Sequence, residues 1–471
     1  RSRLQSRQVG LSPVRLGPES LPTLPAAIAR FDYDREAQKI GIVHFGIGAF
    51  HRAHQAWYTD LAMSAGDRDW AICGVSMRSP TVAEQLTPQG GLYTLTQRAG
   101  ESVKARVIGS VREVLFAPEQ FERVVGRLAD PSCHIASLTV TEKGYARGEG
   151  GELDLRLARQ SFYPMLSEAL RRRRDVGLGG LTILSCDNLA DNGRVLDRLI
   201  TQWLDAELPD LVGWYESECR VPSTMIDRIV PRTRPEDLVS LEREIGVVDE
   251  GAVFTEEFSQ WVVEDNFAGR RPRWEDHGVE LVKDVAPFET AKLRMLNGAH
   301  SLLAYCGLQA GYRFVHEAVA DPLLRDLAEK LMRDEAIPTI DATPDRDLEE
   351  YANHLMKRFA DPALMHRLDQ IAMDGTQKIP QRWLDTALKS TELGRPFGSI
   401  RSAFDAWIWH LVDGRWVDDP HGEILKRVAG DEGRAAVIEY CLLDGRNGGP
   451  LWPGYELLAK TLTGSVDNQT A

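Results

Sequence analysis

Short apolar runs rich in β-favouring residues recur along the first part of the chain and predict strands. Between several of them, apolar residues recur with a helical period, as over Glu119–Leu128 and Arg194–Leu204. Strands that alternate with helices predict a largely parallel sheet with helices on both faces. The predicted strands are Ile40–Phe45, Trp70–Val75, Leu92–Thr96, Ala105–Ile108, His134–Val140, Leu181–Ser185 and Glu280–Val285.

The pattern changes after Pro287, where helical periodicity replaces the strand runs. We therefore place a domain boundary near residue 286, which gives an α/β domain over 1–286 and a mostly helical domain over 287–471. No Gly/Ser-rich linker marks the boundary. The helices predicted in the second domain are Leu293–Leu303, Pro322–Met332, Leu348–Arg358 and Ile400–Leu411.

The composition is that of an ordinary globular protein, with 43% hydrophobic and 27% charged residues in 471. The formal net charge is -14, from 56 Lys and Arg against 70 Asp and Glu. This negative charge repels phosphate backbones and anionic lipid, so it argues against nucleic acid and membrane surfaces as partners. We expect a small-molecule ligand.

The six cysteines are scattered, and no two of them form a CxxC pair. This spacing argues against a disulfide framework or a zinc knuckle and predicts reduced core thiols. No uncharged apolar run approaches the ~18 residues that a membrane span requires, and the first twenty residues contain no apolar signal stretch. We therefore expect a cytoplasmic protein.

Two glycines follow the first predicted strand, in Gly46-Ile47-Gly48, and a helix opens after them. A dinucleotide-binding turn has this position, because glycines let the backbone approach a pyrophosphate at a helix N-terminus. His51 replaces the third glycine of the GxGxxG pattern, and glycine-containing turns are also common elsewhere.

The next question is which residues a nicotinamide cofactor at this turn would use for its chemistry. No Tyr is followed four residues later by Lys, no HExxH motif occurs, and His51 and His54 lack further ligands at metal-binding spacing, which argues against a catalytic metal. At ~100° per residue, Lys292, Asn297 and His300 share one broad helix face. The alternative is a solvated lysine, a helix-interrupting Asn-Gly and a core histidine. An Asn-Gly inside a helix costs roughly 1 kcal/mol relative to Ala, which indicates a local reason for it.

Three further segments contain polar residues for which a functional and a purely structural role are both possible. Asp187 and Asn188 follow a buried strand and serve either a ligand or a turn. Asp227 and Arg228 lie in an apolar run and form either a catalytic or a structural pair. Residues 374–382 resemble a solvated turn that contains cations.

Together these blocks resemble the mannitol dehydrogenase family, the polyol-specific long-chain dehydrogenases. The resemblance covers residues 40 to about 385, with the blocks in family order and with family-like spacing. The blocks are IVHFGIGAFHRAHQ, SLTVTEKGY, SCDN, STMIDRIVP, QWVVEDNF, KLRMLNGAHS and QIAMDGTQKIPQR.

The resemblance implies a Rossmann-type N-terminal domain, a mostly helical C-terminal domain as in 6-phosphogluconate dehydrogenase-like folds, and an active site between them. It also implies metal-independent oxidation of a secondary alcohol with NAD. Lys292 would be the general base, and it would act in the neutral form near pH 7–9, which requires a pKa below the ordinary ~10.4. Asn188 and Asn297 would polarise the reacting oxygen, and His300 would position lysine and substrate. Asp227 and Lys378 would contact substrate hydroxyls. The cofactor contacts would be Gly46, Ile47, Gly48, Ala49, Phe50, Arg78 and Glu142.

The substrate stays open between a sugar acid and a neutral polyol. Gln370 stands where the mannitol 2-dehydrogenase branch has an arginine, and the run around it is similar to D-mannonate oxidoreductases, the fructuronate reductases. The segments Tyr312–Glu317 and Cys73–Val75 are more similar to the mannitol enzymes. A carboxylate substrate needs a fixed cation, for which Arg367 and Arg382 are the candidates. We therefore favour D-mannonate over D-mannitol, D-arabinitol or sorbitol.

The cofactor preference also departs from the family pattern, because Arg78-Ser79-Pro80-Thr81 lacks the acidic residues that NAD-preferring mannitol enzymes have there. NAD is the prediction, with NADP as the alternative.

Two other classes of protein are alternatives to this enzyme. One is a non-catalytic dinucleotide-binding protein, which would not need the Lys-Asn-His set, and the other is a decarboxylating dehydrogenase, which would need more clustered cations. The oligomeric state is left open, and the sequence is compatible with a monomer.

Overall fold

The computed structural model describes residues 14–100, 102–148, 150–341, 347–414, 417–444 and 449–466. The chain divides into two compact units, Arg1–Val285 and Ala286–Ala471, which we call unit 1 and unit 2. Each is described by itself.

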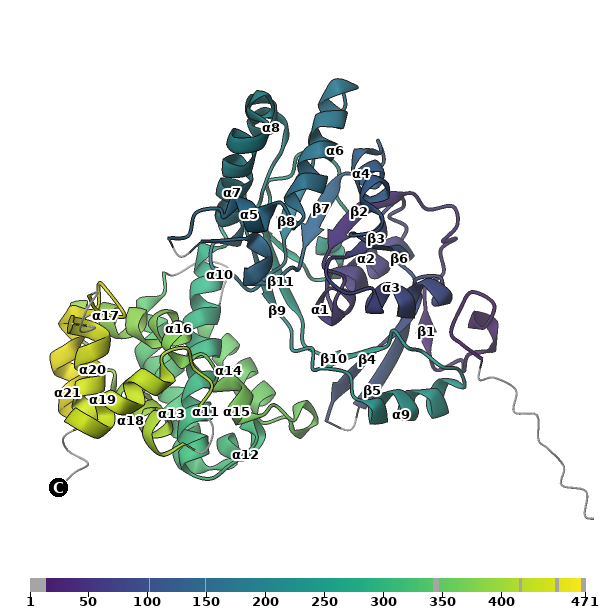
Figure 1. Cartoon of the computed structure of the whole chain (residues 1–471). Helices are drawn as coiled ribbons and strands as arrows, with labels where there is room; N and C mark the ends of the chain where they lie inside the picture. Colours follow the sequence, from purple (N-terminus) through teal and green to yellow (C-terminus); the bar gives the residue numbers. More distant parts are fainter. Residues whose placement is uncertain are drawn as a thin grey trace, which may run out of the picture. The chain divides into compact units, whose positions relative to one another are not determined.

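Unit 1 contains a five-stranded parallel sheet with the order β6-β3-β2-β7-β8 (Figure 1). The first of these strands in the chain, β2, lies in the middle, so the chain moves outward from it in both directions. This is the Rossmann order, in which ligands bind at the carboxyl ends of the strands beside the central switch point. The Rossmann-type prediction is confirmed. The strands are β2 (Ile40–Phe45), β3 (Ala71–Ser76), β6 (Val111–Phe116), β7 (Ile135–Leu138) and β8 (Thr182–Ser185).

Helices connect these strands. Right-handed crossovers place the helices before and after β3 on one face of the sheet and the helices before and after β7 on the other face. The helix after β2 is broken at His54, whose φ of -123° and ψ of -94° are not helical. The helices are α1 (Ala49–Ala53), α2 (Gln55–Ser64), α3 (Thr81–Leu86), α4 (Phe121–Ala129), α5 (Leu155–Ala158), α6 (Tyr163–Asp175), α7 (Asn192–Glu207), α8 (Val212–Glu218) and α9 (Pro235–Ile245).

The strands predicted at Leu92–Thr96 and Ala105–Ile108 do not join the parallel sheet. They pair antiparallel with each other, with Tyr93 opposite Ile108, in a separate four-stranded sheet. Too few residues separate the two strands for the crossover that a parallel pair requires, so they form an antiparallel hairpin. A third sheet has the order β12-β11-β9. The strands of the two sheets are β1 (Ala29–Arg30), β4 (Tyr93–Ala99), β5 (Ser102–Ile108), β10 (Val253–Glu256), β9 (Thr224–Asp227), β11 (Gln260–Glu264) and β12 (Glu280–Val282).

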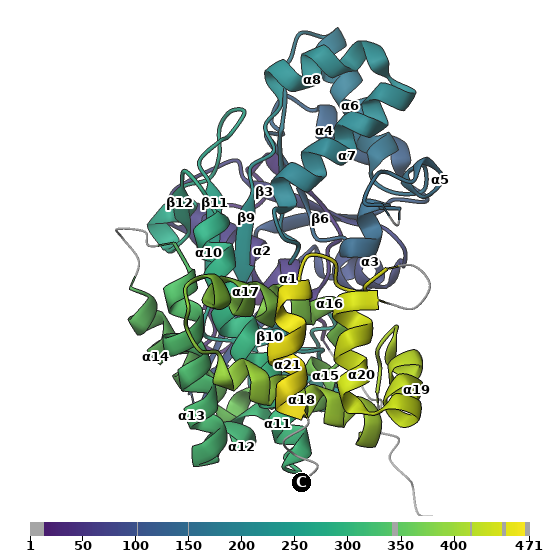
Figure 2. The ribbon, with the colours of Figure 1, turned by 90° about the vertical axis from the view of Figure 1, so that its left-hand side faces the viewer.

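Unit 2 is mostly α-helical, as predicted, and the helices α18 to α21 lie side by side in it (Figure 2). Its buried side chains form a core of their own, separate from the core around the sheet of unit 1. The helices are α10 (Ala286–Ala291), α11 (Gly298–Gln309), α12 (Val315–Ala320), α13 (Pro322–Lys330), α14 (Leu348–Phe359), α15 (Leu368–Ile371), α16 (Gly375–Ile379), α17 (Asp385–Glu392), α18 (Gly398–Asp413), α19 (Gly422–Glu432), α20 (Arg434–Glu439) and α21 (Ala459–Val466).

The cysteines are buried free thiols in these cores, namely Cys73, Cys133, Cys186, Cys219, Cys306 and Cys441. In the described part of the chain, no helix is both long enough and apolar enough to cross a bilayer.

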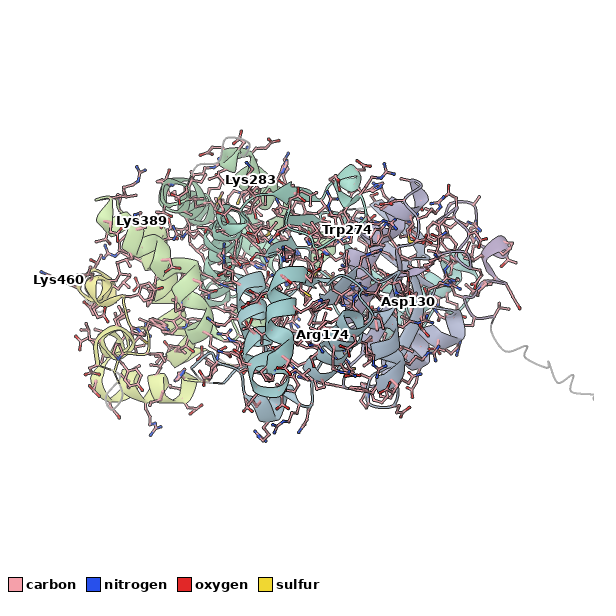
Figure 3. All side chains as sticks on the ribbon, turned by 90° about the horizontal axis from the view of Figure 1, so that it is seen from above. Asp130, Arg174, Trp274, Lys283, Lys389 and Lys460 are labelled. Carbon is pink, nitrogen blue, oxygen red and sulfur yellow. The ribbon has the colours of Figure 1, made fainter. Side chains whose placement is uncertain are left out.

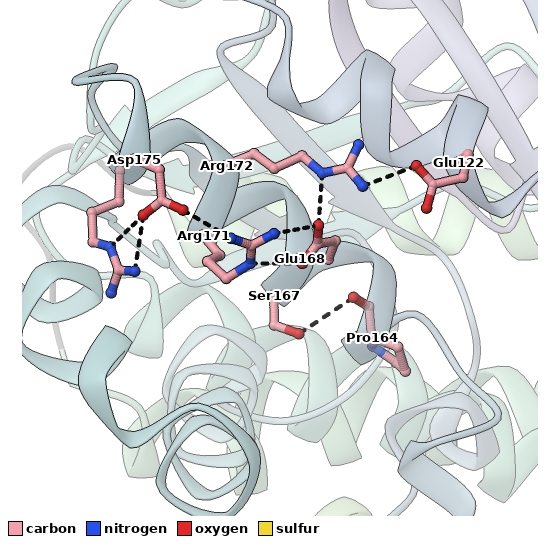
Figure 4. A network of polar contacts seen from close by, with 8 residues as sticks. Glu122, Pro164, Ser167, Glu168, Arg171, Arg172 and Asp175 are labelled. Carbon is pink, nitrogen blue, oxygen red and sulfur yellow. Dashed lines mark hydrogen bonds and ion pairs between the residues drawn. The ribbon is translucent and has the colours of Figure 1, made fainter.

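Charged side chains cover the outer surface of α6, where Arg174 is labelled in Figure 3. This helix contains four consecutive arginines, and the three half-buried ones are paired with carboxylates (Figure 4). Arg171 donates to Glu168 at 2.8 Å, and Arg172 donates to Glu168 at 2.7 Å and to Glu122 at 2.9 Å. The cations of α6 are therefore neutralised locally and do not form a phosphate-binding surface.

Candidate functional site

A cavity of about 510 Å³ lies at the carboxyl ends of β2, β3 and β7 in unit 1. Of the predicted cofactor contacts, Gly46, Ile47, Gly48 and Arg78 line it. The strand order places the nucleotide of a Rossmann fold at this edge. The cavity is therefore the candidate dinucleotide site.

The two glycines of the turn serve different purposes. Gly46 has a φ of +92°, and a Cβ there would lie 2.2 Å from the backbone oxygen of Thr139. Only glycine fits such a position, because the left-handed region and the close approach both exclude a side chain. Gly48 is the N-cap of α1 with extended dihedrals, and a Cβ there would meet only the Gly46 oxygen, at 3.8 Å. The fold itself therefore needs Gly46 and leaves space at Gly48.

A chain of buried hydrogen bonds holds the turn from below. The Thr139 hydroxyl donates to the Gly46 carbonyl at 2.7 Å, so His44 Nε2, 2.8 Å from the same hydroxyl oxygen, must be the donor to it. In the neutral ring Nδ1 then carries no proton; it lies 2.8 Å from the Ser137 hydroxyl oxygen, and that hydroxyl donates to Oε1 of Gln55 at 2.7 Å. Burial lowers the pKa of His44 to about 3, which agrees with this neutral tautomer.

His51, the residue in place of the third glycine, packs against the same His44. The His51 ring stacks on the His44 ring with centroids 3.4 Å apart and 16° between the planes. The third glycine of the usual pattern allows a helix to pack closely on the strand. Here two flat rings fill the interval between α1 and β2, so the close approach of backbones is replaced by a ring stack.

Asp187 of the SCDN block shapes the loop after β7. Its carboxylate accepts from the backbone N–H groups of Val140 and Thr141, both at 3.0 Å, and from the Tyr145 hydroxyl at 2.8 Å. Burial raises the pKa of Asp187, while these hydrogen bonds act in the opposite direction. Because Val140 and Thr141 line the cavity, Asp187 shapes the site through the backbone. Of the two interpretations of this residue, the structure favours the turn.

The other predicted cofactor contacts lie outside this lining. Ala49 and Phe50 begin α1, and Phe50 stacks on His54 with ring centroids 5.1 Å apart. Glu142 is exposed in the 3₁₀ turn after β7. The cavity as described has Lys143 on its wall instead of Glu142.

Two of the predicted site residues, Asn188 and Asp227, lie near the ends of strands in unit 1. Asn188 is exposed three residues beyond the end of β8, at the sheet edge that also holds the glycine turn. Asp227 is buried at the end of β9. Its neighbour Arg228 donates to the carbonyl oxygens of Ala53 and Glu256 and covers the Trp57 ring, 4.5 Å from its centroid. Arg228 is thus a structural cation that ties α1 to β10 of the four-stranded sheet.

The helix that contains Lys292 is not a plain α-helix. A π-helical segment, Lys292–Asn297, connects α10 to α11 without a break in the helix. The prediction of 100° per residue is wrong through this segment, because a π turn closes with i→i+5 hydrogen bonds and changes the phase of the helix beyond it. Such segments often occur at functional sites. Lys292 is buried, 7% exposed, and Asn297 ends the segment.

The structure shows why the unfavourable Asn297-Gly298 pair occurs within this helix. A Cβ on Gly298 would lie 3.1 Å from the Arg382 carbonyl oxygen and 3.3 Å from Leu331. The Trp383 indole donates to the Gly298 carbonyl at 3.0 Å. Glycine thus lets the segment Pro380–Leu384 pack directly on the helix one residue beyond Asn297.

Cations surround His300 in unit 2. Its ring stacks on Phe359 with centroids 5.5 Å apart, and Arg382 donates to the adjacent Ser301 hydroxyl at 2.6 Å. Burial, followed by His366 and the charges of Arg382, Arg358 and Lys378, holds the pKa of His300 well below its ordinary value. Burial also lowers the pKa of Arg382 to about 10. Arg382 and Lys378 are therefore close enough to act electrostatically on the histidine that the sequence predicts as a substrate contact.

The remaining candidates near position 370 lie at the surface or bind locally. Arg367 is 53% exposed and forms an ion pair with Asp369. Gln370 is exposed in α15. Lys378 donates to the nearby Met373 carbonyl at 2.6 Å. Of the two arginines proposed for a carboxylate, Arg382 has the environment of a site and Arg367 that of a surface pair.

Sequence reasoning missed His44, Ser137 and Thr139 as supports of the turn. His44 and Ser137 lie in strands that look like core, where apolar residues are the rule, and Thr139 follows the second of these strands directly. Polar residues on two predicted neighbouring strands were the signal that could have found them. Among the described residues, no group of three or more His, Cys, Asp or Glu is placed to hold a metal ion.

Comparison with known proteins gives a consistent result over most of the chain. The profile of the mannitol dehydrogenase Rossmann domain matches residues 40–276, and that of the mannitol dehydrogenase C-terminal domain matches residues 284–418. The uncharacterized oxidoreductase YeiQ of Escherichia coli is 43% identical over 77% of this chain and 77% of its own. The D-mannonate oxidoreductase of Escherichia coli is 41% identical over 81% of this chain and 82% of its own. The structure of Pseudomonas fluorescens mannitol 2-dehydrogenase with NAD and D-mannitol is 32% identical, with a TM-score of 0.83 over 97% of both chains.

Proposed function

Because this chain belongs to the mannitol dehydrogenase family of oxidoreductases acting on CH-OH groups, we propose that it interconverts a secondary alcohol and a ketone of a sugar acid with NAD. The preferred pair is D-mannonate and D-fructuronate. The reaction needs no metal ion, since the proposed base and amide donors are side chains.

The observation that supports this most is the cavity at the two-glycine turn, which suits a dinucleotide. A pyrophosphate needs backbone N–H groups that no side chain covers, and Gly48 is exposed and unobstructed. Bound NAD would accept a hydride from the carbinol carbon. The N–H groups of Gly46, Ile47 and Gly48 donate to the carbonyls of Val75 and Gly46, so this turn would lie against the phosphates and the first N–H groups of α1 would bind them. Arg78 lies at the end of the cavity formed by β3.

The proton must leave the hydroxyl as the hydride leaves the carbon, so a base and donors to the developing alkoxide are required. Lys292, buried in the π-helical segment, is the proposed base. Asn297 at the end of the same segment and Asn188 beyond β8 are the proposed amide donors. His300 would position lysine and substrate, and Asp227 and Lys378 would bind substrate hydroxyls.

The cations around His300 favour a sugar acid over a polyol. A carboxylate in a partly desolvated site needs a fixed cation, and arginine binds it with two parallel hydrogen bonds. Arg382 is held by Ser301 and has no acidic partner among the described residues. A neutral polyol needs no such charge.

The two arginines provide a matched test. Arg382→Gln should raise KM for D-mannonate at least tenfold and leave any activity on D-mannitol within threefold, because only the acid loses an ion pair. Arg367→Gln, the control, should change neither constant by more than threefold. The sugar-acid proposal is wrong if the wild-type kcat/KM for D-mannitol exceeds that for D-mannonate, or if Arg367→Gln has the effect expected of Arg382→Gln.

A polyol is the second candidate, and one observation favours it. The similar Pseudomonas fluorescens enzyme was crystallised with NAD and D-mannitol and aligns over 97% of this chain. A rate panel of D-mannonate, D-mannitol, D-arabinitol and D-sorbitol separates the two candidates. An enzyme that turns over none of them but binds NADH would instead support a non-catalytic dinucleotide-binding protein.

A further inference from the structure

The end of the unit 1 cavity that β3 forms has an unusual chemistry. Ser76 is the last residue of β3, and Met77, Arg78 and Ser79 continue along the cavity wall. In folds with this strand order, the residues beyond the second strand meet the adenosine ribose. An Asp or Glu there accepts from the 2′-hydroxyl of NAD, whereas an Arg accommodates the 2′-phosphate of NADP.

The polar side chains at this end of the cavity are an arginine and neutral hydroxyls. The Arg78 side chain is exposed, and in the described part of the chain it forms no hydrogen bond or ion pair. The Ser79 and Thr81 hydroxyls lie 2.7 Å apart in the same turn and are exposed as well. The described residues that line the cavity include Arg78 and Lys143 but no Asp or Glu.

The arginines of α6 show what an ordinary surface cation does in this protein. Arg171 and Arg172 share Glu168, and each has a further carboxylate partner (Figure 4). With 70 acidic residues against 56 basic ones, carboxylates are plentiful on this chain. An exposed arginine on a cavity wall without such a partner has its donors available to an anionic ligand.

We propose that this subsite accepts the 2′-phosphate of NADP(H), so that the protein binds both NAD(H) and NADP(H). Arg78 forms the ion pair with the phosphate, and the Ser79 and Thr81 hydroxyls exchange the hydrogen bond between them for hydrogen bonds to its oxygens. NAD(H) still binds, because its 2′-hydroxyl meets the same hydroxyl groups without loss of a charged partner. This inference rests on the proposed function, since it presumes that the cavity holds a dinucleotide.

Direct binding tests the proposal without reliance on turnover. NADH and NADPH are titrated against the whole protein by cofactor fluorescence, in the wild type and in Arg78→Ala, Arg78→Glu and Lys143→Ala. The wild-type dissociation constants should differ by less than tenfold. Arg78→Ala should weaken NADPH at least tenfold and NADH less than threefold, and Arg78→Glu should weaken NADPH further by repulsion. Salt should weaken NADPH more steeply than NADH, and Arg78→Ala should remove the difference.

Lys143→Ala is the matched control, because Lys143 is a second exposed cation of the same cavity but follows β7. It should change both dissociation constants by one common factor. Wild-type protein that binds NADH but binds NADPH more than tenfold more weakly overturns the inference and leaves the proposed function intact. An Arg78→Ala variant with unchanged NADPH affinity also overturns it. Protein that binds neither cofactor would refute the proposed function itself.

Discussion

The contrast between Gly46 and Gly48 gives a prediction that separates folding from binding. At Gly48 a valine would occupy extended backbone, which β-branched residues favour, and its Cβ would meet only one atom, at 3.8 Å. We expect the free energy of unfolding of Gly48→Val to stay within about 1 kcal/mol of wild type. A side chain there would nevertheless cover the backbone that approaches the pyrophosphate.

Gly46→Ala should do the opposite. The positive φ costs about 1–3 kcal/mol for alanine, and the 2.2 Å approach to the Thr139 oxygen adds an overpacking cost of about 1–3 kcal/mol. The sum is about 2–6 kcal/mol. At roughly 2.1 cal/mol/K per residue, the 285 residues of unit 1 have an unfolding entropy of about 0.6 kcal/mol/K. The Tm of this unit should therefore fall by about 3–10 °C.

The assay pairs thermal unfolding with NADH fluorescence titration on the same preparations. Gly48→Val should keep its Tm and lose at least 100-fold in NADH affinity, whereas Gly46→Ala should lose stability. NADH affinity within threefold of wild type in a folded Gly48→Val protein would place the dinucleotide elsewhere. A Gly46→Ala protein with an unchanged Tm would refute the account of the turn.

Three further outcomes are expected. Lys292→Ala should lower kcat for alcohol oxidation by at least 10³-fold with NADH affinity nearly intact, and a variant within tenfold of wild type would remove lysine as the base. Asn297→Ala should cost roughly 10²–10³ in kcat, and an effect on KM alone would contradict the alkoxide role. Burial lowers the pKa of His44 to about 3 and, with the charge of Arg358, that of His366 to about 4, below the ordinary 6.5. As the pH falls from 6.5 to 5, the unfolded chain binds protons that the folded chain does not, so the free energy of unfolding should fall by about 1.1 kcal/mol per pH unit on average for each histidine. Urea unfolding across this range measures the slope, and His366→Gln should make it shallower by about that amount.

Features that depend on local chemistry could be predicted from the order of the amino acids alone. A buried strand followed by two glycines and a helix specifies a turn whatever surrounds it, because a positive φ needs glycine in any context. The alternation of strands and helices likewise predicted the Rossmann-type unit and the helical second half. The cost of Asn297-Gly298 inside a helix showed that something must require it, although not what.

Tertiary structure decided whatever depends on a partner distant in the sequence. The π turn at Lys292–Asn297 and the need for Gly298 involve the segment Pro380–Leu384, which packs on that helix, and periodicity within the helix cannot contain this information. Arg367 and Arg382 have the same chemistry in sequence. One is paired with Asp369 and the other lies beside Ser301, and this difference separates them as substrate ligands. The residue type limits which charge a side chain can have, but the neighbours in space decide whether that side chain is available to a ligand, and only the folded chain shows those neighbours.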